Sequence, residues 1–104
     1  MLPKKSRLPV EMCLGKKGRT DRSPLFFLKS FPAETDHSRF GAVVGKKVAA
    51  TAVERNRIRR MILDIMGEAG VRWPIADYLL IAGPACKGKT REEIYGELIQ
   101  YGAA

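Results

Sequence analysis

The side chains best suited to bind a ligand are basic residues in the middle of the chain. Arginine grips phosphate oxygens with paired hydrogen bonds and stacks on bases, and asparagine adds a donor and an acceptor. Four arginines within six positions repel one another, so an isolated protein gains nothing from them, whereas a polyanion would offset the repulsion. We therefore predict a nucleic-acid contact made by Lys46, Lys47, Arg55, Asn56, Arg57, Arg59 and Arg60.

The overall charge points to the same class of partner. The 104 residues carry 19 Lys+Arg against 11 Asp+Glu, which gives a net charge of +8. The basic excess falls in residues 1–22 and 39–60, while the rest of the chain is neutral to acidic. Two basic segments favour a polyanion, with nucleic acid as the first candidate. An anionic membrane surface is less favoured, because no segment pairs a basic face with interfacial aromatic residues. A merely solvated basic face remains the alternative.

Residues that could support catalysis are sparse. The sequence contains no nucleophile elbow, Walker-type loop or histidine-rich metal motif. Asp64 and Glu68 are four positions apart and could form a weak metal site, although such pairs more often decorate a solvated helix. Cys13 and Cys86 fit no zinc or redox spacing, so we expect buried or half-buried thiols in a reducing compartment. His37 lies in a polar stretch, and we interpret it as a solvated loop residue.

Three strands and two helices should position the basic cluster. Strands are predicted at 25–31, at 39–45 and at 76–83. The second is apolar on both faces and is expected at a central position, and the third is expected to be buried on both sides. Residues 10–14 could form one or two helical turns after Pro9. The longest apolar run, 78–82, is far too short to cross a bilayer.

The helix that follows the lysine pair should have two faces. Thr51 and Glu54 form a capping box, and the helix is expected to end near Met66 or Gly67. Its apolar residues follow one helical stripe, and its arginines fall largely on the other side. That stripe is Ile58, Met61, Ile62 and Ile65. A second capping box at Thr90 opens a last helix with Ile94, Leu98 and Tyr101 along one face.

Two stretches together resemble a known family. Residues 39–47 comprise the predicted strand and the Lys-Lys pair that follows it, and residues 52–60 belong to the predicted helix and carry Arg-Asn-Arg-Ile-Arg-Arg. This combination resembles the signature of the bacterial ribonuclease P protein family. Residues 77–82 are similar to the family's last strand, and 3–8 are similar to its basic N-terminus. The resemblance extends from about residue 3 to residue 101.

The resemblance implies a fold and a division of labour. The fold would be a single α/β domain of order α-β-β-β-α-β-α, with helices on a four-stranded sheet and a left-handed crossover, although general rules favour the right hand. The domain would span 1–104, with a basic, flexible N-terminus at 1–8 and a tail at 102–104. The protein would be a cytoplasmic subunit of an endoribonuclease whose RNA holds Mg²⁺ and removes the 5′ leader from precursor tRNA. The protein itself would not be the catalyst.

The resemblance also implies binding positions. Its helix motif maps onto the basic cluster described above, which would contact the catalytic RNA. The substrate leader would lie in a cleft for which Phe26, Phe27 and Leu28 are candidates, and Lys4, Lys5 and Arg7 would add N-terminal contacts. Three departures from the family pattern weaken or rebuild such contacts. Met12, Cys13 and Leu14 replace cleft aromatics, and Leu63 and Gly83 stand where arginine is common.

Two other functions remain open. A small basic RNA-binding module of the ribosomal-protein type would share the charge but lack a role in cleavage. A stand-alone metal nuclease would need Asp64 and Glu68 as ligands, and no converging set of carboxylates accompanies them. The Lys-Lys and Arg-Asn-Arg block favours the ribonuclease P subunit. Its implied partners are the catalytic RNA and precursor tRNA, with neither a membrane nor a small-molecule substrate.

Overall fold

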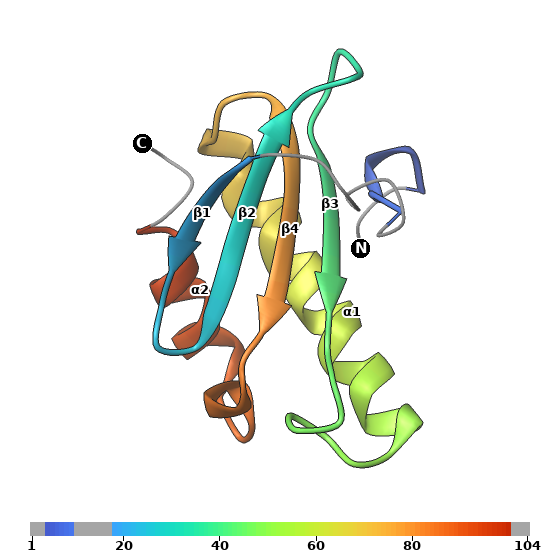
Figure 1. Cartoon of the computed structure of the whole chain (residues 1–104), viewed down its shortest axis with the longest axis vertical. Helices are drawn as coiled ribbons and strands as arrows, with labels where there is room; N and C mark the ends of the chain where they lie inside the picture. The colour runs from blue at the N-terminus through green and yellow to red at the C-terminus, as the bar shows by residue number, and fades with distance from the viewer. Residues whose placement is uncertain (1–3, 10–17, 101–104) are drawn as a thin grey trace.

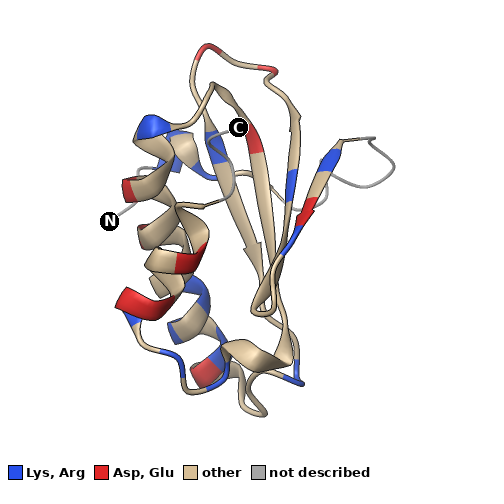
Figure 2. Cartoon of the chain, turned by 90° about the vertical axis from the view of Figure 1, so that its left-hand side faces the viewer, with Lys and Arg blue, Asp and Glu red and all other residues tan. Residues whose placement is uncertain are grey.

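The computed structural model describes residues 4–9 and 18–100, which form one sheet covered by two helices. The helices and the sheet make two layers, with both helices on the same side (Figure 2). The strands are β1 (Arg19–Arg22), β2 (Phe26–Pro32), β3 (Arg39–Val43) and β4 (Ala76–Ala82). The helices are α1 (Ala52–Ala69) and α2 (Arg91–Leu98), and short 3₁₀ turns occupy Lys4–Ser6, Gly70–Arg72 and Pro84–Cys86.

The sheet order is β1-β2-β4-β3, and only β3 and β4 pair in parallel. Helix α1 connects these two parallel strands. In Figure 1 both strands run downward, β4 lies to the left of β3, and α1 lies behind the sheet, which makes the crossover left-handed. The mixed α/β fold with this uncommon crossover is the one that the resemblance implied.

The three strands predicted from residue pattern are confirmed within one or two residues, but β3 is not central. It is the last strand of the sheet, and β2 and β4 occupy the middle. The apolar residues on both faces of β3 suggested a central strand, but the strand is covered at its outer edge by Arg7 and Leu8 instead of by another strand. Arg7 forms a bridge with Phe40, and the Leu8 amide donates to the Phe40 carbonyl at 2.8 Å. The apolar outer edge of β3 is thus protected by the N-terminal segment.

The N-terminal region only partly follows expectation. Residues 4–8 lie against β3, and Leu8 is buried, so this stretch is not a free basic arm. The predicted helical turn at 10–14 and the tail at 102–104 lie outside the described residues. Strand β1 carries the polar sequence Arg-Thr-Asp-Arg, which offers no apolar alternation, so the residues alone gave no signal for it.

The main core lies between the sheet and the helices. Alternate residues of β2 and β4 point into it and meet the buried stripe of α1. Its central residues are Phe26, Leu28, Ile62, Ile65, Leu80, Ile94 and Leu98. A smaller cluster of Leu8, Phe31 and Leu79 lies on the opposite face of the sheet.

A buried ion pair joins β3 to β4 on that opposite face. Arg39 donates from Nε to Asp77 Oδ1 at 3.1 Å and from Nη2 to Oδ2 at 2.8 Å. The Asp77 residue is 1% exposed. The two residues are also register partners, so the two-pronged contact fixes the alignment of the parallel strands.

Candidate nucleic-acid interface

Helix α1 begins where the sequence predicts. Thr51 is the N-cap, and its side-chain oxygen accepts the Glu54 backbone N–H at 3.2 Å. The reciprocal half of the expected capping box does not form, because the Glu54 carboxylate accepts hydrogen bonds from Arg57 instead. That contact with the Arg57 guanidinium lowers the pKa of Glu54 below its ordinary value. The helix runs to Ala69, two or three residues beyond the predicted end.

The helix has the two faces that the sequence predicts. Ile62 and Ile65 are fully buried in the main core, and Ile58 and Met61 pack at its border. The opposite side exposes Asn56, Arg57, Arg59 and Arg60, while Arg55 is half-buried. Lys46 and Lys47 are also exposed, in the turn that leads from β3 to the helix. We call these seven residues the basic face.

Internal contacts restrain several side chains of the basic face. Arg55 Nη1 donates to the carbonyls of Ala49 and Ala50 at 3.1 and 2.9 Å, so this side chain braces the loop before the helix. Arg59 Nη2 donates to Asn56 Oδ1 at 3.1 Å. Most of each guanidinium stays available to a partner, because these contacts use one or two of its five donors.

Ion pairing does not neutralise this face. Among its four arginines, and within the described part of the chain, only Arg57 is ion-paired with a carboxylate, that of Glu54. Arg60 forms no hydrogen bond or ion pair with another described residue. Arg57, Arg59 and Arg60 are thus presented outward, on a helix whose other side is fixed in the core.

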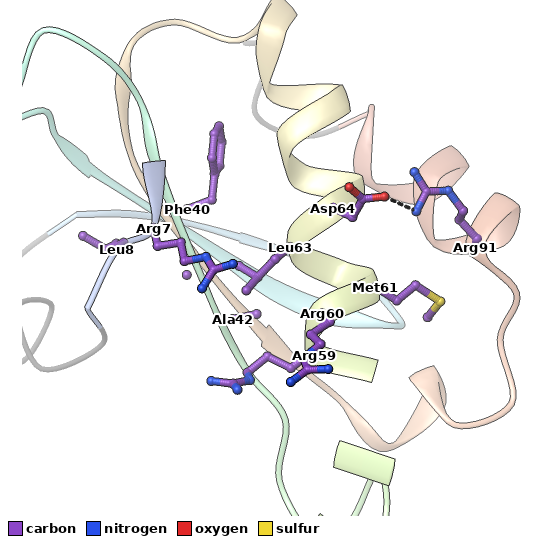
Figure 3. A pocket seen from close by; sticks show the side chains of 11 residues that line it. Arg7, Leu8, Phe40, Ala42, Arg59, Arg60, Met61, Leu63, Asp64 and Arg91 are labelled. Atoms are coloured by element: carbon purple, nitrogen blue, oxygen red, sulfur yellow. Dashed lines mark ion pairs between the residues drawn. The ribbon is translucent and has the colours of Figure 1, made fainter. Parts of the chain in front are cut away.

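A groove extends the basic face towards the N-terminal segment. It lies between Arg7–Leu8, β3 and α1, and its volume is about 730 Å³. Arg59 and Arg60 line one side and Arg7 lines the other. Figure 3 shows the Arg7 side chain extending from the N-terminal segment towards α1. Lys4 and Lys5 are exposed in the 3₁₀ turn just before it. No sequence signal indicated that Arg7 lies opposite the helix arginines.

The expectation for a leader cleft on β2 needs correction. Phe26 and Leu28 are 2% and 0% exposed and pack beneath the helices, so neither can line an open cleft. The period-two alternation of a strand places Phe27 on the other face, where it is 43% exposed. The guanidinium carbon of Arg22 lies 5.8 Å from the centre of its ring. Phe27 alone of the three stays a candidate for contact with a nucleic acid.

The neighbours of Phe27 make its face partly apolar and partly basic. Ile81 is its register partner on β4, and Arg22 is its partner on β1. Lys29 follows two positions along the same strand and therefore shares the face. An exposed aromatic ring beside two cations suits stacking on a base together with attraction to phosphates.

The two acidic residues considered as metal ligands have a different role. Arg91 of α2 contacts both, at 2.8 Å to Asp64 Oδ2 and at 2.6 Å to Glu68 Oε1. The Arg91 guanidinium thus takes the place that a metal ion bound by the two carboxylates would need, and it links α1 to α2. The described residues include no group of three or more His, Cys, Asp or Glu side chains arranged to hold a metal ion. The contacts that both carboxylates make with Arg91 disfavour the metal-nuclease alternative.

His37 and Cys86 lie away from the basic face. His37 Nδ1 is 2.9 Å from Asp36 Oδ1, and its Nε2 is 2.9 Å from the Lys5 carbonyl, so it ties the β2–β3 loop to the N-terminal segment. It is therefore more than a solvated loop residue. Cys86 is buried as expected, and burial raises the pKa of its thiol. Cys13 lies outside the described residues.

None of the helices that the structure describes has the length and apolar character needed to cross a bilayer.

Comparison with known proteins gives a consistent result. A family model described as Ribonuclease P matches residues 11–102. The ribonuclease P protein component of Lactobacillus johnsonii is 36% identical over 86 residues, which cover 76% of this chain and 70% of the relative. The component from Thermus scotoductus is 36% identical over 85 residues, which cover 82% of this chain. This chain spans 49% of the length of that second relative.

Solved structures resemble the fold over nearly its whole length. The RNase P protein of Staphylococcus aureus has a TM-score of 0.76 and 27% identity, and the match covers 91% of this chain and 90% of that one. The RNase P protein of Thermotoga maritima has a TM-score of 0.79 with coverage of 93% and 94%. Its identity of 20% makes it similar in fold alone.

Proposed function

Because the chain belongs to the ribonuclease P protein family, we propose that it assists a catalytic RNA in removing the 5′ leader from precursor tRNA. The observation that carries the proposal is the exposed basic face of α1, set on a helix whose opposite side is locked into the core. Such a face supplies the phosphate contacts that dominate binding to a structured RNA. This processing of precursor tRNA would take place in the cytoplasm, where bacterial tRNA precursors are made.

The chemistry in this proposal resides in the RNA. Mg²⁺ prefers several oxygen ligands in octahedral geometry. The two carboxylates that could have begun such a set, Asp64 and Glu68, instead bind Arg91. The protein's own residues therefore fit the ion poorly, and we assign it to the partner RNA. In this proposal the protein lowers the electrostatic repulsion between the catalytic RNA and the precursor tRNA and positions the substrate.

The substrate leader, in this proposal, lies across the face of the sheet that carries Phe27. A single strand binds by stacking its bases on aromatic rings while a basic groove follows its backbone. Phe27 supplies an exposed ring, and Arg22 and Lys29 supply the charge. This face lies on the opposite side of the sheet from both helices, so catalytic RNA and leader could bind at the same time.

Reconstitution with the matching catalytic RNA tests the proposal. We expect the protein to raise cleavage of precursor tRNA at moderate Mg²⁺ and to show no cleavage without the RNA. Robust cleavage by the protein alone would contradict the assignment. Binding of the catalytic RNA without any effect on cleavage would instead favour the RNA-binding module of ribosomal-protein type.

The leader contact is tested with Phe27→Ala. Loss of one stacking ring should weaken binding of a leader-bearing substrate about tenfold. Binding of mature tRNA, which lacks the leader, should stay unchanged. Ile99→Ala is the matched control, because Ile99 is an exposed apolar residue just after α2. An equal loss with both substrates would show that Phe27 does not contact the leader.

A further inference from the structure

The groove beside the basic face combines charge with apolar surface. Its basic residues are Arg7, Arg59, Arg60 and Arg91, and α1 also supplies the half-buried apolar side chain of Leu63. Asp64 lies at the end nearest α2, where Arg91 pairs with it at 2.8 Å (Figure 3). Arg91 thus offsets the Asp64 charge, and the charge left in the groove, from Arg7, Arg59 and Arg60, is positive. A volume of about 730 Å³ falls within the range of sites for small organic ligands.

Phosphate contact alone does not account for this shape. A phosphate on the helix surface needs only the exposed guanidiniums and no apolar surface. The groove adds the half-buried Leu63 side chain, and the core residues Phe40 and Ala42 of β3 lie beneath it as its floor. A ligand that uses all of these features has a flat, weakly polar part and an anionic part. Guanidinium planes also stack on bases, so the arginines can contact both parts.

We propose that this groove holds one unpaired nucleotide of RNA, with its base beside Leu63 and its phosphate at Arg7, Arg59 and Arg60. A base-paired nucleotide remains stacked within its duplex, so only a looped-out or single-stranded nucleotide can enter. The proposal rests on the proposed RNA-binding function and adds a selective site to it. The groove would make the protein recognise an unpaired position in RNA rather than a helical backbone alone.

The groove is separate from the face proposed for the substrate leader. Phe40 packs in the main core on the helix side of the sheet, where Ala42 accompanies it. Phe27 lies on the other face. One strand of RNA would have to pass around the edge of β3 to reach both places. The nucleotide in the groove is therefore assigned to a different RNA segment from the one that contacts Phe27.

The wall that carries Arg7 is held in place before any ligand arrives. The Arg7 amide donates to the Lys4 carbonyl at 3.1 Å, and the next amide, that of Leu8, donates to Phe40. His37 Nε2 lies 2.9 Å from the Lys5 carbonyl. The other wall is the core-anchored helix α1. Because both walls are already fixed, little conformational entropy is lost when a ligand binds, and this favours a small ligand such as a nucleotide.

Filling the groove without changing its charge tests the proposal. Leu63→Trp places a bulky ring where the base would lie and retains every arginine. Ile99→Trp is the control, since it adds the same ring at an exposed site outside the groove. We expect Leu63→Trp to weaken binding of the catalytic RNA about tenfold, the scale of one stacked base, and Ile99→Trp to have no effect. Unchanged binding by a folded Leu63→Trp protein would overturn the proposal.

A second measurement on the whole chain covers the case in which Leu63→Trp fails to fold. Backbone amide shifts are followed by NMR during titration with adenosine 5′-monophosphate and, separately, with inorganic phosphate. We expect the nucleotide to shift the amides of Leu8, Ala42 and Leu63, phosphate to leave Ala42 and Leu63 unchanged, and Arg7→Ala to reduce the nucleotide response. Equal responses to both probes would refute a nucleotide site and leave a phosphate contact only.

These outcomes separate the groove from the proposed function. If the wild-type protein stimulates the catalytic RNA but the groove variants bind it normally, the groove proposal fails and the function stands. If the wild-type protein neither binds nor stimulates the RNA, the proposed function fails first.

Discussion

Replacing Arg60 should remove one phosphate contact without harm to the fold. Arg60 is exposed and forms no hydrogen bond or ion pair with another described residue, so Arg60→Ala removes no polar contact within the described part of the chain. Each neutralised phosphate adds about 0.7–0.9 to the slope of log affinity against log salt concentration. The plots of log affinity against log salt concentration for the wild-type and Arg60→Ala proteins are taken to converge at about 1 M salt. Losing one phosphate contact then lowers the affinity about four- to fivefold at about 0.15 M salt, which is about 1 kcal/mol of binding free energy.

The assay is binding of the catalytic RNA across a salt series. The control is Arg72→Ala, because Arg72 is exposed in the 3₁₀ turn beyond the far end of α1. We expect the slope to fall by almost one for Arg60→Ala and to stay unchanged for Arg72→Ala. Equal slopes for wild type and Arg60→Ala would refute the inference that this side chain binds phosphate.

Three further changes test other parts of the structure. Arg39→Ala should lower the free energy of unfolding in urea by about 3–5 kcal/mol, because it leaves Asp77 buried and unpaired; a loss under 1 kcal/mol would contradict this. Ile62→Ala should cost about 2–5 kcal/mol in the same assay, since Ile62 is 0% exposed in the core, and a loss under 1 kcal/mol would show that the core adjusts freely. The hydrogen bonds to Asp36 and to the Lys5 carbonyl raise the pKa of His37. The charged imidazolium therefore stabilises the fold fully below pH 6.5, and this contribution is lost as the pH rises through the raised pKa. NMR titration should therefore give a pKa above 6.5 that falls in Asp36→Asn, and an equal value in both proteins would exclude the Asp36 contact.

Local sequence determined the elements that carry the site. Threonine caps at Thr51 and Thr90, period-two alternation in β2 and the 3.6-residue apolar stripe of α1 each act over a few neighbouring residues. They therefore predict strands, helix starts and the outward direction of the arginines without any tertiary information. The polar strand β1 escaped prediction because its formation depends on pairing with β2 and not on its own residues.

Contacts distant in sequence were decided by the tertiary structure alone. The burial of Phe26 and Leu28 and the exposure of Phe27 depend on which face of β2 receives the helices, and alternation within one strand does not specify that choice. Similarly, Arg7 meets the helix arginines only because residues 7 and 8 dock on the edge of β3. Arg91 pairs with both Asp64 and Glu68 only because α2 packs beside α1. Residue type and short-range spacing set what each side chain can bind, whereas the packing of distant segments sets which side chains act together.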